Sequence, residues 1–246
     1  MPSSPEDLLA LRIGGATVAE NLQRAIDRGD LIADPDGRLR LPPGRDNGAN
    51  WAWVDHGQPL FCTFLMKFLF RQAYASGAVP QGCSACYKVK VLPRTVRELV
   101  AAWGVAKGIE CRSKWGIDLH NSYSQNIYAG YFYTSGLEAA RAVYRVAREA
   151  FAGEPKIGPD IALSIKRGCS EYEAALGPSD RFEFAPELAA LEAYLRSRYR
   201  AERQSERLPP MPLAHWIDIA FRTGDDTYMD FTGGRRLRPP SVSYAP

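Results

Sequence analysis

Histidine is scarce in this 246-residue chain, with three residues in all, which leaves little room for a metal centre built on imidazole ligands. The chain also lacks a P-loop, a G-x-G-x-x-G turn, an H-E-x-x-H pair and a G-x-S-x-G elbow. These absences exclude the most recognisable nucleotide-binding, zinc-protease and serine-hydrolase motifs. No reaction class therefore follows from a known signature, and enzymatic activity is left open.

Long apolar runs are missing as well. No stretch approaches the roughly 20 apolar residues that cross a bilayer, and the most apolar stretch, residues 60–70, contains Thr63 and Lys67. The first seven residues lack the basic and apolar regions of a signal peptide. We therefore expect a cytoplasmic protein with no membrane partner. Because 46% of its residues are hydrophobic, it has enough apolar material for a sizeable core.

The chain contains five cysteines, and disulfides are rare in the cytoplasm. Cys83 and Cys86 form a C-x-x-C pair, whose short loop lets both thiolates point the same way. Cys62 lies in an apolar helical stretch and is interpreted as a core thiol. The sequence thus predicts a metal site that staples distant segments together, with the four ligands Cys83, Cys86, Cys111 and Cys169.

The scattered spacing of these four cysteines favours an iron–sulfur cluster. Structural zinc sites usually use two C-x-x-C pairs, whereas this chain has one. The ligation resembles in style that of [4Fe–4S] clusters in certain glycosylases, primases and nucleases, although neither the compact ferredoxin spacing nor a C-x-x-x-C-x-x-C triad is present. A [4Fe–4S] cluster is the first expectation and zinc the alternative. The third interpretation is that no metal binds, and that Cys83 and Cys86 form a redox pair or are simply buried.

Positive charge is concentrated around the cysteine pair. The formal net charge of the whole chain is only +3, yet residues 83–115 contain seven basic residues against two acidic ones. Such a region attracts a phosphate backbone, although a solvated basic face gives the same pattern. If it binds nucleic acid, we expect phosphate contacts from Lys88, Lys90, Arg94, Arg97, Arg112 and Lys114.

Residues 117–133 form the most polar and aromatic segment of the chain. Polar side chains need partners when they are buried, so a binding cleft is one explanation, and a tyrosine-rich strand with its hydroxyls in water is the other. Aromatic rings beside basic side chains can stack on bases, which makes Tyr123, Tyr128 and Tyr131 candidate nucleic-acid contacts. Asp118 and His120 are the candidate acid–base pair if this segment lines an active site.

Periodicity and turn chemistry predict an α+β fold that is predominantly helical with short strands. The pattern of residues 6–41 predicts two helices around a glycine turn, followed by a hairpin whose turn is formed by residues 34–37. This order resembles the latter part of a winged helix-turn-helix, which implies nucleic-acid binding, but it has no room for a full first helix. We expect three regions: this segment in residues 1–44, a main metal-binding domain in 51–208, and a C-terminal extension with a basic, proline-rich tail in 209–246.

The leading functional hypothesis is a DNA- or RNA-binding protein with a structural iron–sulfur cluster, acting as one subunit of a larger nucleoprotein assembly. One alternative is an iron–sulfur enzyme that acts on a nucleobase or small molecule in a pocket lined by residues 118–133. The other is a zinc-stabilised module that binds a protein partner.

Overall fold

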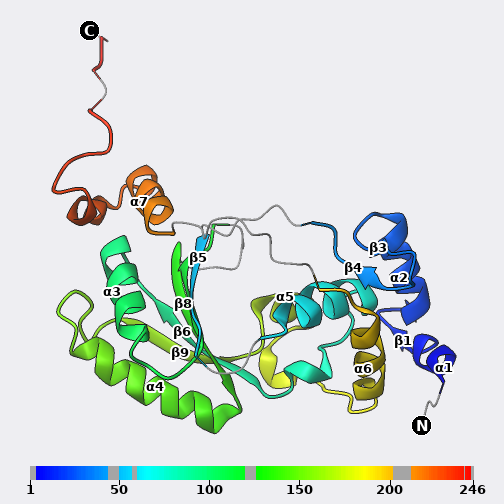
Figure 1. Cartoon of the computed structure of the whole chain (residues 1–246). Helices are drawn as coiled ribbons and strands as arrows, with labels where there is room; N and C mark the ends of the chain where they lie inside the picture. The colour runs from blue at the N-terminus through cyan, green and yellow to red at the C-terminus, as the bar shows by residue number, and fades with distance from the viewer. Residues whose placement is uncertain are drawn as a thin grey trace. The chain divides into compact units, whose positions relative to one another are not determined.

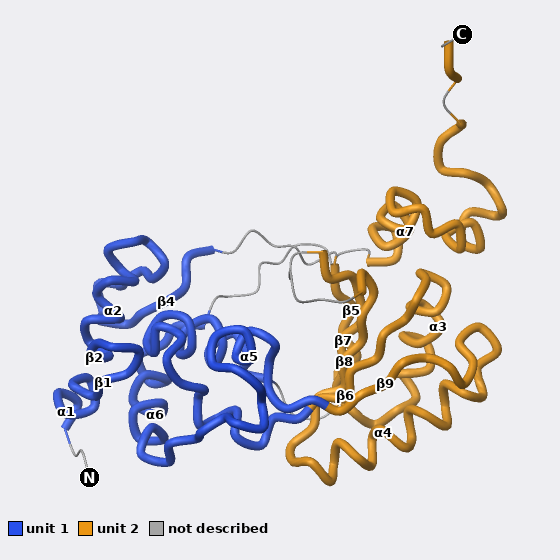
Figure 2. Tube along the Cα trace, turned by 180° about the vertical axis from the view of Figure 1, so that it is seen from behind, with its two compact units in different colours: residues 1–45, 58–87, 166–207 blue, residues 46–57, 88–165, 208–246 orange. Residues whose placement is uncertain are grey.

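The computed structural model describes residues 4–43, 50–56, 60–119, 126–201, 212–240 and 242–244. The chain forms two compact units, each assembled from three separate segments (Figure 2). Unit 1 comprises residues 1–45, 58–87 and 166–207, and unit 2 comprises residues 46–57, 88–165 and 208–246. Among the described residues, no helix combines the length and apolarity needed to cross a membrane.

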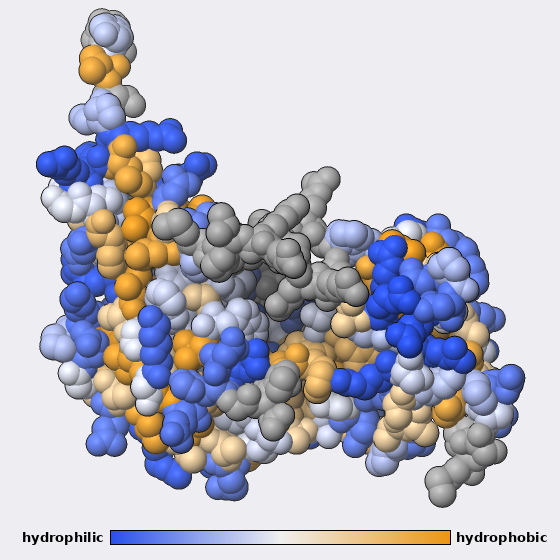
Figure 3. Space-filling view, in the orientation of Figure 1, coloured by the Kyte–Doolittle hydropathy of each residue, from blue (hydrophilic) through white to orange (hydrophobic). Residues whose placement is uncertain are grey.

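The N-terminal part of unit 1 consists of two helices and two short hairpins. Its elements are α1 (Pro5–Leu9), β1 (Arg12–Ile13), β2 (Ala16–Thr17), α2 (Val18–Asp27), β3 (Ile32–Ala33) and β4 (Leu39–Arg40). Thr17 begins α2 by accepting a hydrogen bond from the Glu20 amide at 3.2 Å, while the Glu20 carboxylate accepts one from the Thr17 amide. Hydrophilic side chains gather over α2 and the β3–β4 hairpin (Figure 3).

The rest of unit 1 is helical. Its elements are η2 (Thr63–Ala73), η3 (Gln81–Cys83), α5 (Ser170–Leu176), η4 (Ser179–Arg181) and α6 (Leu188–Arg198). η2 is a π-helix, in which hydrogen bonds join residues five positions apart, and it ends where the Tyr74 amide donates to the Leu69 carbonyl at 2.8 Å. Phe68, Leu191 and residues of α2 are buried together in the main core of this unit.

Unit 2 is built on a five-stranded sheet with the strand order β5-β7-β8-β6-β9. The elements are β5 (Trp51–Val54), β6 (Cys86–Leu92), α3 (Val96–Ala106), β7 (Ser113–Ile117), β8 (Tyr128–Ser135), α4 (Leu137–Ala152), β9 (Ala162–Arg167), α7 (Pro212–Thr223) and η5 (Asp226–Phe231). From β6 to β9 the chain follows the strand–helix–strand–strand–helix–strand order of the ferredoxin-like fold, with β6 and β8 central. β5 adds a fifth strand beside β7. The boundary between the units falls inside β6 and β9.

The core of unit 2 lies between the sheet and the helices α3 and α4, which cover one face of it (Figure 1). Val89 and Val91 of β6, Ile117 of β7 and Phe132 of β8 all point toward these helices and are buried there, as is Leu99 of α3. Successive side chains of a strand point to opposite faces, so the intervening residues must lie on the other face.

The largest side chain in this core, Trp115, depends on a glycine in the neighbouring strand. Trp115 is fully buried and pairs directly with Gly130 across β7 and β8. A Cβ atom at position 130 would overlap the indole ring. The indole nitrogen donates a hydrogen bond to the Ser113 hydroxyl at 2.9 Å, so the one polar atom of this ring is satisfied.

The α+β class is confirmed, with 45% helix and 18% strand, but two other expectations for the fold are wrong. The strands are not all short, since β6 and β8 span seven and eight residues of one sheet. The predicted four-cysteine metal site is not formed: in the part of the chain that the structure describes, no group of three or more Cys, His, Asp or Glu is placed to hold a metal ion. Cys111 is buried in the core of unit 2, whereas Cys83, Cys86 and Cys169 belong to unit 1.

The close approach of Trp115 to β8 predicts that Gly130→Ala lowers the free energy of unfolding by about 1–3 kcal/mol, the usual cost of overpacking a core. Chemical denaturation followed by circular dichroism measures this change. Gly104→Ala in α3 is the matched control, because a Cβ there meets nothing within 4 Å. Alanine is also favoured over glycine in a helix by up to ~1 kcal/mol. If Gly130→Ala were as stable as the wild type, the close packing of Trp115 against Gly130 would be contradicted.

Candidate nucleic-acid interface

The sheet face of unit 2 opposite α3 and α4 carries alternating aromatic and basic side chains. In β5, Ala52 and Val54 are buried in the core, so Trp51 and Trp53 lie on this second face. The same alternation places further residues on this second face, from β6, from β7 and the residue before it, and from β8. We call it the aromatic–basic face, formed by Trp51, Trp53, Lys88, Lys90, Arg112, Lys114, Tyr131 and Tyr133.

Strand register brings a first group of these side chains together. Lys114 pairs with Trp53 of β5 on one side and with Tyr131 of β8 on the other. Its ammonium group lies 4.1 Å from the ring centroid of Trp51 and 5.3 Å from that of Tyr131. These two rings are 6.1 Å apart, so one cation sits against aromatic rings from both neighbouring strands.

A second group extends the face toward β6. The rings of Trp53 and Tyr133 stack with their centroids 5.8 Å apart, and the side chain of Trp53 is 45% exposed. The Arg112 guanidinium lies 5.4 Å from the Trp53 ring, and the Lys88 ammonium lies 5.2 Å from the Tyr133 ring. Asp55, just beyond β5, forms an ion pair with Arg112 at 2.6 Å. Cations and ring faces are therefore interleaved across the four strands.

Five of the residues predicted to bind nucleic acid lie on this face: Lys88, Lys90, Arg112, Lys114 and Tyr131. Sequence reasoning missed Trp51, Trp53 and Tyr133. The signal was present in the Trp-Ala-Trp and Tyr-Phe-Tyr alternation, because residues two apart in a strand share a face. This alternation identifies the exposed residues only once it is known whether the odd- or the even-numbered residues of each strand are buried.

Tyr128, which was also predicted to contact nucleic acid, is buried in the core of unit 2 and does not lie on the aromatic–basic face. It is 3% exposed, and its hydroxyl donates to the Asp225 carboxylate at 2.7 Å. Burial raises the pKa of Tyr128, and this hydrogen bond raises it further. Tyr123 and His120 lie outside the described residues. Asp118 directly follows β7, and its amide donates a hydrogen bond to the Ile127 carbonyl at 2.8 Å. Because His120 is outside the described residues, the structure does not describe the predicted acid–base pair of Asp118 and His120.

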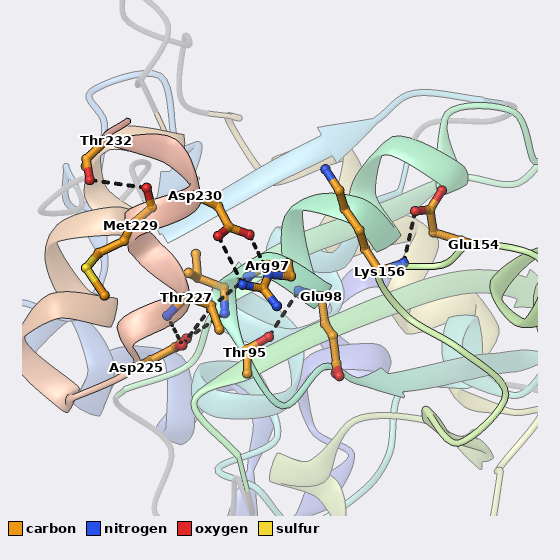
Figure 4. Close-up of polar contacts among 11 residues, drawn as sticks. Thr95, Arg97, Glu98, Glu154, Lys156, Asp225, Thr227, Met229, Asp230 and Thr232 are labelled. Atoms are coloured by element: carbon orange, nitrogen blue, oxygen red, sulfur yellow. Dashed lines mark hydrogen bonds and ion pairs between the residues drawn. The ribbon is translucent and has the colours of Figure 1, made fainter. Parts of the chain in front are cut away.

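Arg94 and Arg97 flank the start of α3, where each side chain contacts a carboxylate. Arg97 forms an ion pair with Asp230 of η5 (Figure 4), and its hydrogen bond to that carboxylate raises the pKa of Arg97. Arg94 pairs with Glu98 at 2.6 Å. These two arginines are engaged within the protein and are not part of the aromatic–basic face.

The amides of the first turn of α3 are also occupied by side chains from the C-terminal segment. The Val96 amide donates to Asp225 at 2.6 Å. The Arg97 amide donates to the Thr227 hydroxyl at 3.3 Å, and Figure 4 shows Asp225 and Thr227 beside Arg97. The Asp225 carboxylate therefore takes the place that a bound phosphate would have at a helix N-terminus. This removes the sequence-based argument for a phosphate contact here.

Asp225→Ala should lower the free energy of unfolding by about 1–3 kcal/mol, because it leaves the buried Tyr128 hydroxyl and a first-turn amide without their acceptor. Asp218→Ala is the control. Asp218 pairs with Arg222 in α7, and both side chains are exposed, so its loss should change stability little. Thermal or chemical denaturation compares the two variants. Equal effects would show that Asp225 does not anchor η5 to α3.

Comparisons of the chain with models of protein families, with curated proteins and with solved structures find no match. The function is therefore inferred from the geometry of the aromatic–basic face.

Proposed function

We propose that this protein binds single-stranded nucleic acid, RNA or DNA, on the aromatic–basic face of unit 2. The observation that carries the proposal is the interleaving of four aromatic rings with three basic side chains, Lys88, Arg112 and Lys114, on one sheet surface. Proteins that bind single strands without sequence preference combine stacking rings with a positively charged track for the backbone.

The arrangement favours a single strand over a duplex for a geometric reason. In a duplex the faces of the bases are stacked on one another, so rings on a protein surface cannot reach them. In a single strand the bases can be splayed out and stacked on aromatic side chains. Trp53, which is the most exposed of these rings, and Tyr131 would accept bases in this way. Lys114, beside them, would neutralise an adjoining phosphate, and Arg112 would do so by exchanging its ion pair with Asp55 for one with the phosphate.

The architecture adds support by analogy. The RNA-recognition motif also places aromatic side chains on a sheet and stacks two or three bases on them. The β8 sequence Tyr-Ala-Gly-Tyr-Phe-Tyr does not match the signature of that motif, K/R-G-F/Y-G/A-F-V-x-F/Y. The analogy therefore concerns the sheet and the chemistry of its face, and not membership of that family.

Removal of a stacking ring should weaken binding without unfolding the protein. Tyr131→Leu and Trp53→Leu should each lower the affinity roughly 5- to 100-fold, as expected for ~1–3 kcal/mol per stacked base. Fluorescence anisotropy with labelled oligo-uridine and oligo-thymidine of about 12 nucleotides measures this, a length within the ~4–16 nucleotides that one OB fold binds.

Tyr144→Leu is the matched control, because Tyr144 is a half-buried tyrosine of α4 with the Arg148 guanidinium 5.5 Å from its ring, in the layer on the opposite face of the sheet. It should bind like the wild type. The proposal fails if the Tyr131 and Trp53 variants also bind like the wild type, or if duplex of the same length binds as tightly as single strands.

The cations of the face should appear in the salt dependence of binding. Replacement of Lys114 by glutamine should reduce the slope of log affinity against log salt concentration by about 0.7, the value expected for one lost phosphate contact on a single strand. Arg145→Gln, at an exposed position of α4, should leave the slope unchanged. A slope that changes equally in both variants would indicate diffuse attraction to the whole protein rather than to this face.

A further inference from the structure

Three cysteines of unit 1 converge on one small apolar cluster, which is separate from the main core of the unit. Cys83 is buried in this cluster, and Cys86 and Cys169 pack against it. The remaining buried members are Met66, Phe70, Val79, Tyr172 and Phe182. The chain segments that supply these thiols are far apart in sequence.

The loop that carries the C-x-x-C pair is held by a buried carboxylate. Glu192 of α6, 8% exposed, accepts hydrogen bonds from the Gln81 amide at 2.6 Å and the Gly82 amide at 2.9 Å. The same carboxylate accepts a hydrogen bond from the Tyr74 hydroxyl at 3.1 Å. The positions of η3 and Cys83 are thereby fixed before any ligand binds.

Cys169 is brought to this loop by backbone contacts. The Gly168 amide donates to the Cys86 carbonyl at 2.9 Å, and the Arg167 guanidinium donates to the Ser84 carbonyl at 3.2 Å. Gly168 adopts a left-handed φ of +64°, and a Cβ there would press on Tyr172 and Phe182, so the chain turns sharply just before Cys169.

Cys62 directly precedes η2, at its N-terminal end. Met66 and Phe70, four and eight residues further along, both belong to the apolar cluster, and residues four apart lie on one side of a helix. The Tyr172 hydroxyl lies 3.2 Å from the Cys83 sulfur, which holds this thiol inside the cluster. The helical spacing therefore places Cys62 on the side of η2 that faces this cluster.

The four thiols are too dispersed for a single ion. Structural zinc requires all its thiolates on one atom, at about 2.3 Å each, and no three of these thiols are placed to hold one ion. A [4Fe–4S] cluster differs because its four irons each take one thiolate, so the sulfur atoms stand further apart. The apolar surroundings and the nearby Arg167 suit a buried cofactor of net negative charge.

We propose that Cys62, Cys83, Cys86 and Cys169 bind a [4Fe–4S] cluster in unit 1. This set differs from the one expected from spacing, because Cys62 replaces Cys111. The site also includes η2, a π-helix of 11 residues, and π-helical turns are rare and often mark functional sites. The proposal concerns unit 1 alone and does not depend on nucleic-acid binding by unit 2.

The test transfers a preformed synthetic [4Fe–4S] cluster, ligated by small thiolates, to the full chain without oxygen. The four protein thiols replace the four small thiolates and give them their protons, so no electron is transferred. After gel filtration we expect about four irons and four sulfides per chain and absorbance near 400 nm. Failure to retain iron, or purification of the chain with one zinc that blocks the transfer, would overturn the proposal.

Variants of the cysteines identify the ligands. Cys62→Ala, Cys83→Ala, Cys86→Ala and Cys169→Ala should each lose most of the bound iron, with circular dichroism confirming that the variant is folded. Cys111→Ala is the matched control and should keep the full cluster, because Cys111 lies in the core of unit 2. Iron retained by Cys62→Ala and lost by Cys111→Ala would contradict the assignment. If one of the four variants does not fold, the stoichiometry of the wild type and of Cys111→Ala still decides.

Discussion

The alternation of side chains along the strands of unit 2 is the constraint on which both its core and its proposed interface depend. Trp115 fixes that alternation, because its buried ring contacts Phe132 and Phe151 edge-on at 5.5 and 6.1 Å and requires Gly130 beside it. A shift of one residue in either strand would exchange the two faces of the sheet. The rings of Trp53 and Tyr131 would then be forced against α3 and α4. The packing of the core therefore determines where the aromatic–basic face lies.

The basic residues of unit 2 divide into two groups with different physical roles. Arg97, at the start of α3, is paired with a carboxylate and helps to attach η5 to this helix. Lys88 and Lys114 instead lie against aromatic rings, and Arg112 combines a ring contact with its ion pair to Asp55. A lysine ammonium sits on a flexible four-carbon stem, so Lys114 can leave a ring for a phosphate as a base takes its place. The same contacts that order the free face can thus be exchanged for contacts with a ligand.

Local sequence patterns predicted the parts of the structure that depend on neighbours in the chain. The second helix of the N-terminal segment, α2, and the turn between β3 and β4 belong to this class. Tyr128 and Tyr131 looked equivalent in the sequence, yet one is buried and the other is not, because they differ in strand parity. The ion pair of Arg97 with Asp230 joins residues that no local pattern connects. Such pairings depend on how the whole chain folds.

The cysteines show the same limit in chemical terms. Spacing predicted Cys111 as a metal ligand, and an apolar helical stretch indicated a core thiol at Cys62, whereas we propose the reverse from their surroundings. The Cys111 sulfur donates to the Tyr133 carbonyl at 3.4 Å, and burial raises the pKa of Cys111, so it is a satisfied neutral thiol in an apolar core. Cys62 directly precedes η2, and Met66 and Phe70 of this helix line the cluster around Cys83. A thiol becomes a ligand when other thiols surround it, and that requires tertiary structure rather than sequence spacing.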